Sequence, residues 1–426
     1  MKSESIKGVI EVNRSKVNED PICDFYTKHP FPPPIENLDG IRDQCQNENL
    51  HRAEYHLLWP HKEYRADLDV LVAGCGTFQS AKYAFCHSAA RVVGIDVSST
   101  SLEHTERLKR NYNLTNLDTR QLPIERVQEL EQQFDLIICT GVLHHLADPD
   151  AGLRALRSVL NPEGAMNLMV YAPYGRAGVR MIQEYCRRLG IETSHQEIHD
   201  LISVLKVLPQ HHPVLSSQRG SRDFFNTDAL ADALLNPRDI AYSVPQLFDF
   251  IERNDLRLAR WYLQAAYLPQ CGQIPTTPHG NTLATLPERE QYVAMELWRG
   301  LMSNHSFVVH RSDSNNDALP ISFNDKSYLR YVPIRMPWTM CVQEGIPEGA
   351  AGVLLNQTHL FQDLFLVISE EEKQLFEAID GHRSISEIVK GKKKASSLAR
   401  EFFEKLWWYD QVVFDTSQGL ARRAQI

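Results

Sequence analysis

Two glycines and an aspartate have the residue types and the spacing of a nucleoside-binding loop. Gly74 and Gly76 follow an apolar segment, residues 68–72, and Asp96 follows a second one, residues 91–95. Glycine lets the backbone approach a ligand closely, and a carboxylate can accept hydrogen bonds from both ribose hydroxyls. A dinucleotide-binding loop has a third glycine where this chain has Gln79. The pattern therefore predicts a nucleoside ligand without phosphate groups.

A pair of histidines, His144 and His145, follows the apolar residues 134–139. An imidazole has an ordinary pKa of about 6.5, so it can take a proton from an acceptor oxygen or nitrogen at neutral pH. For His144 we favour packing within the loop. His145 is either a general base or a histidine bonded to the backbone, and it is our candidate catalytic residue.

Tyr174 and Arg176 follow the next apolar segment, residues 165–171, and are our candidates for substrate binding. A guanidinium can bind a carboxylate of a substrate through two parallel hydrogen bonds. Arg176 could equally pair with an acidic residue of the segment that follows. The sequence leaves these two alternatives open.

Strand-like and helix-like segments alternate through this part of the chain. Strands are expected at residues 68–72, 91–95, 117–122, 134–139 and 165–171, with two more at 256–263 and 305–310. Ser98 is a candidate N-cap, and Ser243 and Gln246 form a candidate capping box. This order predicts an α/β fold with a doubly wound, seven-stranded and mostly parallel sheet.

Three further segments accompany the sheet. Residues 1–65 contain a proline-rich stretch, 29–34, flanked by Tyr26 and Phe31; it is either a surface linker or a cap over the ligand cleft. Residues 172–242 form a polar insertion, placed as a lid at the carboxyl edge of the sheet. Residues 313–426 are expected to form a separate, winged-helix-like module, because capping boxes begin at Ser369 and Ser384 and a strand follows the third helix.

Composition excludes several classes of protein. The formal net charge of −9 argues against nucleic acid as the main partner, and the basic run at residues 390–394 is expected to be a solvated loop.

The eight cysteines contain no Cys-x-x-Cys pair, so neither a zinc site nor a disulfide scaffold is predicted. We expect no bound metal. Without an apolar leader or a membrane-spanning run, a cytoplasmic protein is expected.

The motifs together resemble those of class I S-adenosylmethionine-dependent methyltransferases over residues 66–312. Val-Leu-Val-Ala-Gly-Cys-Gly-Thr at 70–77, Gly-Ile-Asp-Val-Ser at 94–98, the segment 134–146 and Leu-Asn-Pro-Glu-Gly at 160–164 occur in the family's order. The resemblance implies S-adenosylmethionine as cofactor. Its expected binding residues are Gly74, Cys75 and Gly76 at the methionine end, Asp96 and Val97 at the ribose, Gln121 and Leu122 toward the adenine, and Thr140 and Gly141 beside the methyl donor.

The function that this resemblance implies is transfer of a methyl group to an oxygen or nitrogen of a small-molecule acceptor. The acidic net charge and the long lid favour a small molecule over a nucleic acid. Two alternatives remain: a peptide or protein acceptor bound through the C-terminal module, and a non-catalytic binding protein that retains the fold. The second is motivated by Phe78 and Pro123, which stand where the family has a glycine and a carboxylate.

Overall fold

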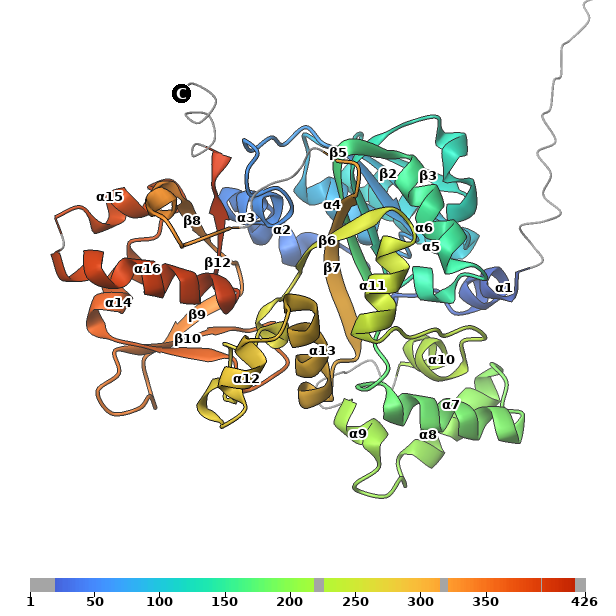
Figure 1. The fold of residues 1–426 in the computed structure, drawn as a ribbon. Coiled ribbons are helices and arrows are strands. Elements are labelled where there is room, and N and C mark those ends of the chain that lie inside the picture. The colour runs from blue at the N-terminus through green and yellow to red at the C-terminus, as the bar shows by residue number, and fades with distance from the viewer. Residues whose placement is uncertain (1–19, 218–225, 315–320, 392, 418–426) are drawn as a thin grey trace, which may run out of the picture.

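A seven-stranded sheet forms the centre of the protein (Figure 1). The structure is a computed structural model that describes residues 20–217, 226–314, 321–391 and 393–417. The strands are β1 (Asp69–Ala73), β2 (Arg91–Asp96), β3 (Leu117–Gln121), β4 (Phe134–Thr140), β5 (Leu160–Tyr171), β6 (Leu256–Trp261) and β7 (Asn304–Arg311), in the order β3-β2-β1-β4-β5-β7-β6. Strand β7 runs antiparallel to β5 and β6, which lie on either side of it, whereas the pairings among β1–β5 are parallel. The predicted doubly wound, mostly parallel sheet is confirmed.

Helices cover both faces of this sheet. One face carries α3 (Glu48–Leu58), α4 (Gln79–Cys86) and α5 (Ser99–Tyr112); the other carries α6 (Pro149–Ser158), α11 (Val244–Glu252) and α13 (Glu288–Arg299). Along β1, Val70 and Val72 pack toward the first set, whereas Leu71 and Ala73 pack toward the second. This alternation explains why the central strands are apolar at almost every position.

The fifth strand begins earlier than the sequence predicts. Leu160 pairs with Phe134 and Ala165 pairs with Leu136, so the residues between them bulge out of the ladder instead of ending the preceding helix. A Cβ atom on Gly164 would lie 2.8 Å from the carbonyl oxygen of Asp135, which explains a glycine inside this bulge. Helix α6 ends at Ser158, two residues before β5 begins.

The insertion after β5 is helical. It contains α7 (Ala177–Leu189), α8 (His195–Leu205), α9 (Pro213–Ser217) and α10 (Thr227–Leu235), with residues 218–225 outside the described part. These helices share an apolar cluster of their own, which also contains Phe25 of α1 (Pro21–Lys28). Figure 1 shows α1 and α10 at the same end of the molecule. The insertion therefore contacts the N-terminal segment as well as the sheet. Two short helices lie elsewhere in the chain: α2 (Arg42–Cys45) precedes α3, and α12 (Gly280–Ala284) lies between β6 and β7.

The C-terminal region has its own core and two small sheets. Its helices are α14 (Glu370–Glu377), α15 (Ile385–Val389) and α16 (Lys393–Trp408); its strands are β8 (Val332–Arg335), β9 (Thr339–Val342), β10 (Gly352–Asn356), β11 (Phe365–Ile368) and β12 (Val412–Asp415). Both predicted capping boxes are present. Strand β12 pairs with β8, whereas the sheet β11-β10-β9 was not predicted. Of the basic run, Lys392 lies outside the described residues.

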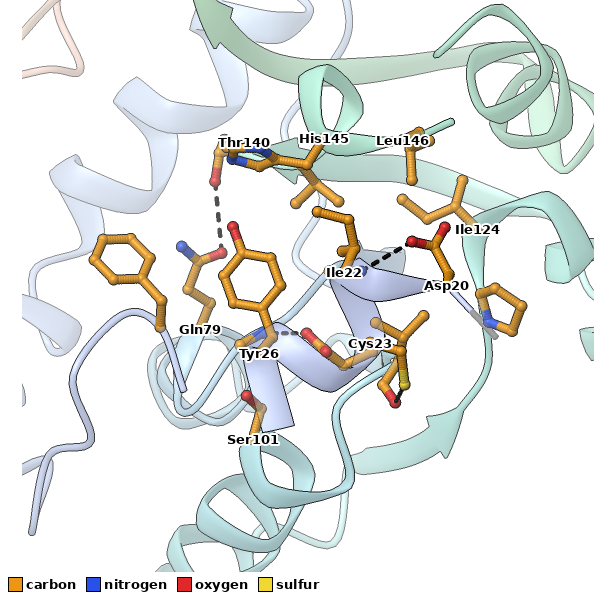
Figure 2. Close-up of a pocket in the computed structure, with 18 of the residues that line it drawn as sticks. Asp20, Ile22, Cys23, Tyr26, Gln79, Ser101, Ile124, Thr140, His145 and Leu146 are labelled. Carbon is orange, nitrogen blue, oxygen red and sulfur yellow. Dashed lines mark hydrogen bonds between the residues drawn. The ribbon is translucent and has the colours of Figure 1, made fainter. Parts of the chain in front are cut away.

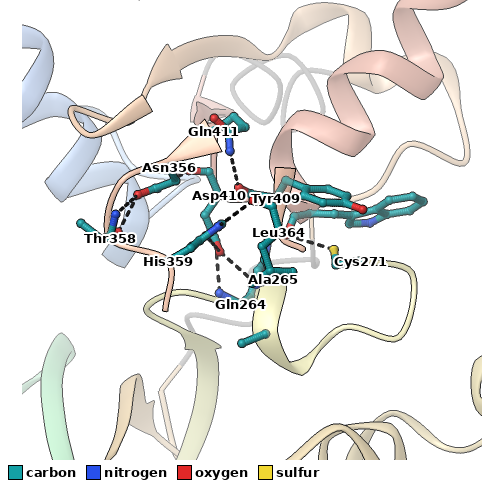
Figure 3. Close-up of polar contacts among 12 residues, drawn as sticks. Gln264, Ala265, Cys271, Asn356, Thr358, His359, Leu364, Tyr409, Asp410 and Gln411 are labelled. Carbon is teal, nitrogen blue, oxygen red and sulfur yellow. Dashed lines mark hydrogen bonds and ion pairs between the residues drawn. The ribbon is translucent and has the colours of Figure 1, made fainter. Parts of the chain in front are cut away.

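One buried carboxylate joins this region to the central sheet (Figure 3). Asp410 is 1% exposed, and its side chain accepts hydrogen bonds from the backbone N–H groups of Gln264 and Ala265, at 3.1 and 2.9 Å, just after β6. Arg260 and His359 each place a nitrogen 3.2 Å from the same carboxylate. A buried charge needs such partners to offset the cost of leaving water. Residues 313–426 remain a proposed module, which has an apolar cluster of its own and is joined to the central sheet through Asp410.

The cysteines depart from the expectation. A disulfide joins Cys45 of α2 to Cys86 of α4, although the spacing of the cysteines indicated none. The other six cysteines are free.

Among the described residues, no group of three or more His, Cys, Asp or Glu side chains is arranged to hold a metal ion. No helix in the described ranges is both long enough and apolar enough to span a membrane.

Candidate functional site

The glycine loop has a backbone conformation that other residues rarely adopt. Gly74 and Gly76 have φ angles of 69° and 55°. A Cβ atom on Gly74 would lie 2.4 Å from Cγ2 of Val142, and one on Gly76 would lie 2.6 Å from the carbonyl oxygen of Phe31. The N–H group of Gly74 donates to the carbonyl oxygen of Ile95 at 2.8 Å. Both conformation and space therefore require glycine at these two positions.

The carboxylate of Asp96 lies at the carboxyl end of β2, beside this loop. Its Oδ2 accepts a hydrogen bond from the N–H group of Gly76 at 2.8 Å, and its Oδ1 accepts one from Ser98 at 2.9 Å. Burial raises the pKa of Asp96, and the hydrogen bonds from Ser98 and Gly76 oppose this shift. Each carboxylate oxygen can accept a second hydrogen bond. Asp96 is thus held in one orientation with lone pairs left for a ligand.

A cavity of about 400 Å³ extends from this loop along the ends of β2, β4 and β5 (Figure 2). Most of the predicted cofactor-binding residues line it, namely Gly74, Gly76, Asp96, Val97, Leu122, Thr140 and Gly141. Two do not. Cys75 is fully buried behind the loop, and Gln121 is exposed and donates to the carbonyl oxygen of Val97 at 3.0 Å. Beyond Leu122, residues 123–126 line the cavity instead.

His145 also lines the cavity, and its ring is oriented by the lid. Its Nδ1 lies 2.5 Å from the carbonyl oxygen of Arg238. Because a carbonyl oxygen only accepts, Nδ1 carries the hydrogen and Nε2 is left with its lone pair. Nε2 is buried and has no hydrogen-bond partner among the described residues. This arrangement has both features considered for His145: a backbone hydrogen bond through one nitrogen and a free acceptor at the other.

His144 has a packing role. It is fully buried, its ring centroid lies 3.8 Å from that of Tyr171, and it does not line the cavity. Burial, followed by the neighbouring His145 and Arg176, holds the pKa of His144 well below its ordinary value. His144 is therefore neutral at physiological pH.

The two candidate substrate-binding residues lie outside the cavity. The guanidinium of Arg176 is 2.6 Å from Asp239 and lies 3.6 Å above the ring of Tyr171. This is the second of the two alternatives left open for Arg176, pairing with an acid of the insertion. Tyr174 is 43% exposed and lies in a shallow surface hollow with Met181 and Leu297.

Tyr26 and Asp232 cover the cavity; the cap considered for residues 1–65 includes Tyr26, whereas the sequence did not indicate Asp232. Both line it, and the hydroxyl of Tyr26 donates to Oδ1 of Asp232 at 2.7 Å. Phe31 and Pro32 line the cavity too, and the hydroxyl of Thr77 donates to the carbonyl oxygen of Pro32 at 2.7 Å. Residues 20–32 therefore lie over the cavity, as expected of a cap. One feature of the sequence could have indicated the role of Asp232: it is an acidic residue within the apolar run 229–235.

Comparisons with known proteins bear on this site. Residues 71–166 match the family model described as a methyltransferase domain. An uncharacterized protein of Synechococcus sp. is 33% identical over 264 residues, 59% of this chain and 63% of that protein. Ubiquinone biosynthesis O-methyltransferase of Acinetobacter baumannii is 30% identical over 96 residues, 22% of this chain and 40% of that enzyme. The matches thus span less than two thirds of the length of either relative.

Two solved structures resemble this chain over most of its length. PKMT2 from Rickettsia typhi has a TM-score of 0.64 and 14% identity, covering 87% of this chain and 75% of that one. The same protein in complex with AdoHcy has a TM-score of 0.63 and 16% identity, covering 90% of this chain and 77% of that one. At this level of identity the likeness concerns the fold alone.

Proposed function

We propose that this protein, which carries a class I S-adenosylmethionine-dependent methyltransferase domain, transfers a methyl group from S-adenosylmethionine to an oxygen or nitrogen of a small-molecule acceptor. The observation that carries the proposal is the pairing of a glycine loop with Asp96, whose two oxygens are each held by a backbone N–H group. Both glycines line the cavity, where a backbone without side chains can approach a nucleoside closely.

The charges around the cavity support a cationic ligand. Four carboxylates line it, those of Asp20, Asp96, Glu125 and Asp232, against one guanidinium, that of Arg126. A cavity with this excess of negative charge attracts a sulfonium cation and disfavours a pyrophosphate. Gln79, which also lines the cavity, stands where a pyrophosphate-binding loop has its third glycine.

In this proposal each group of the chain has a separate task. Gly74, Gly76, Thr140 and Gly141 hold the methionine portion, Asp96 binds the ribose hydroxyls, and Leu122 contacts the adenine side. The bound cofactor supplies an activated methyl group, which an acceptor atom attacks in line. The chain itself contributes alignment and exclusion of water. His145 takes the proton that leaves the acceptor, because this residue lines the cavity and its Nε2 has no hydrogen-bond partner among the described residues.

A small-molecule acceptor is supported by the covering of the cavity. Helices α1 and α10 lie over it and are joined through Tyr26 and Asp232. A peptide or protein acceptor is the second candidate. It is favoured by Trp338 of the C-terminal module, which lines another cavity adjoining the first.

Calorimetric titration with S-adenosylmethionine and with S-adenosylhomocysteine tests the proposal. We expect saturable binding of both. Asp96→Ala should weaken binding by one to two orders of magnitude, since loss of a charged hydrogen-bonding group costs about 1.5–3 kcal/mol. Asp118→Ala is the matched control, because Asp118 is a half-exposed aspartate on the neighbouring β3, outside the cavity. Absence of heat at millimolar cofactor would overturn the enzyme assignment and leave the non-catalytic alternative.

A further inference from the structure

A second cavity, of about 530 Å³, adjoins the cofactor cavity on the side of α3 and α4. We call it the aromatic chamber. Pro32, Gln79 and Thr140 line both cavities. The hydroxyl of Thr140 donates to Oε1 of Gln79 at 3.5 Å, and Figure 2 shows this contact at one end of the cofactor cavity. The Gln79 and Thr140 side chains therefore form the boundary between the two spaces.

Aromatic side chains from distant parts of the chain form the walls of the chamber. Tyr55 comes from α3, Tyr83 from α4, and Tyr262 follows β6. Trp59 and Trp338 add two indole rings, the second of them from the C-terminal module. Aromatic walls bind a planar aromatic ligand through stacked and edge-to-face contacts.

The hydroxyls of the chamber tyrosines are without hydrogen-bond partners in the described residues. None of the hydroxyls of Tyr55, Tyr64, Tyr83 and Tyr262 makes a hydrogen bond with another residue in the part of the chain described, although Tyr55 is only 5% exposed. Burial raises the pKa of Tyr55 and of Tyr262 to about 12, so both are neutral O–H donors at physiological pH. Buried polar groups are normally hydrogen-bonded. These hydroxyls are therefore available to polar groups of a ligand.

The charges of the chamber differ from those of the cofactor cavity. Its charged side chains are Glu54, Arg65 and Lys82, and Glu54 lies 3.4 Å from His87. The chamber thus has no excess of carboxylates that would favour a second cation over a neutral molecule. Phe78, which stands where the related family has a glycine, lines the chamber and adds to its apolar wall.

We infer that the aromatic chamber binds the methyl acceptor, a planar aromatic small molecule that carries a hydroxyl or amino group. The inference rests on the proposed function. The body of the acceptor lies among the tyrosines and tryptophans, and its reacting atom reaches the cofactor cavity by separating the Gln79 and Thr140 side chains, whose hydrogen bond is long at 3.5 Å. A lone pair of that oxygen or nitrogen forms the bond to the methyl carbon, and the sulfur–carbon bond breaks with its electron pair remaining on sulfur. The proton released by the acceptor goes to Nε2 of His145.

The test uses the full chain and 2-naphthol, a planar aromatic alcohol, as probe. We expect saturable binding in calorimetry, and formation of 2-methoxynaphthalene when S-adenosylmethionine is added. Trp338→Ala should weaken naphthol binding about tenfold, because a stacking wall is lost. Trp298→Ala should leave it unchanged, since Trp298 is similarly exposed, 45% against 40%, and lines neither cavity.

Tyr262→Phe is a milder second variant. It removes only a hydroxyl without an internal partner, so the fold should be retained, and naphthol binding should weaken severalfold. Binding of S-adenosylhomocysteine should be unchanged in all three variants. Naphthol that fails to bind, that binds equally to Trp338→Ala, or that binds without being methylated would overturn the acceptor assignment. If S-adenosylhomocysteine fails to bind to the wild type while naphthol binding still depends on Trp338, the proposed function fails and the chamber stands as a ligand site.

Discussion

The hydroxyl of Tyr26 donates a hydrogen bond of 2.7 Å to the carboxylate of Asp232 above the cofactor cavity. Tyr26 belongs to the N-terminal helix α1 and Asp232 to helix α10 of the insertion, so one contact joins the two segments that cover the site. Nδ2 of Asn236 donates to the same tyrosine oxygen at 3.0 Å. Burial, with the nearby Asp232, raises the pKa of Tyr26 well above its ordinary value, so the hydroxyl stays protonated.

Removing the Tyr26 hydroxyl should weaken the contact between α1 and α10, the two helices that cover the cavity. Tyr26→Phe leaves Asp232 without its tyrosine donor, which should cost about 1–2 kcal/mol in the free energy of unfolding. Dissociation of S-adenosylhomocysteine, followed by stopped-flow fluorescence, should become several times faster. Tyr174→Phe serves as control, because Tyr174 is exposed and outside the cavity. An unchanged dissociation rate in Tyr26→Phe would show that this contact does not hold the cover closed.

His145 should carry a hydrogen on Nδ1, which faces the carbonyl oxygen of Arg238. Two-dimensional ¹⁵N NMR of histidine-labelled protein should show this tautomer, and the signal assigned to His145 should vanish in His145→Gln. Methyl transfer to 2-naphthol should fall about 10²- to 10⁴-fold in that variant, the range expected when a general base is lost. Affinity for S-adenosylmethionine should be retained. A hydrogen on Nε2 would contradict the proposed role, because the free lone pair would then face Arg238.

Arg176 should stabilise the fold and have no direct part in substrate binding. Both it and Asp239 are 9% exposed at the side chain, and removal of one partner leaves the other charge buried. Arg176→Ala should therefore lower the free energy of unfolding by about 3–5 kcal/mol, measured by urea denaturation. Arg180→Ala, in helix α7 and at the surface hollow, should have little effect. A loss of substrate affinity in Arg176→Ala with stability intact would restore the carboxylate-binding alternative.

A buried histidine should make the protein sensitive to acid. His310 is 5% exposed, and burial, together with the nearby Arg257, lowers its pKa to about 4. The unfolded chain, with a histidine pKa of about 6.5, binds a proton that the folded chain does not. Stability from this group is present above pH 6.5 and is lost as the pH falls toward 4, by up to about 3 kcal/mol. Thermal melts of His310→Gln should show a flatter dependence on pH in this window than those of the wild type. His199→Gln, at an exposed site, should match the wild type.

The strands, the glycine turn and the helix cap around the site could be predicted because each depends on residues that are close together in the sequence. The apolar strands, the glycines with positive φ and the acid at the end of β2 each follow from a few neighbouring residues. Ser98 was predicted as an N-cap, and its hydroxyl accepts a hydrogen bond from the N–H group of Ser101 at 3.1 Å. The bulge that lengthens β5 was missed, since it depends on pairing with β4.

The positions of most strands along the chain, the glycine loop and the placement of Asp96 follow from the sequence alone, because they depend on backbone geometry over short stretches. Which side chains cover the loop, and which line the chamber beside it, depends on the packing of elements that are distant in the sequence. Tyr26 and Asp232 are 206 residues apart, and Cys45 and Cys86 are 41 residues apart. Likewise, Arg176 meets Asp239 where a substrate carboxylate was one alternative. Contacts between distant residues form when packed elements bring them together, and they leave no periodic or local pattern in the chain.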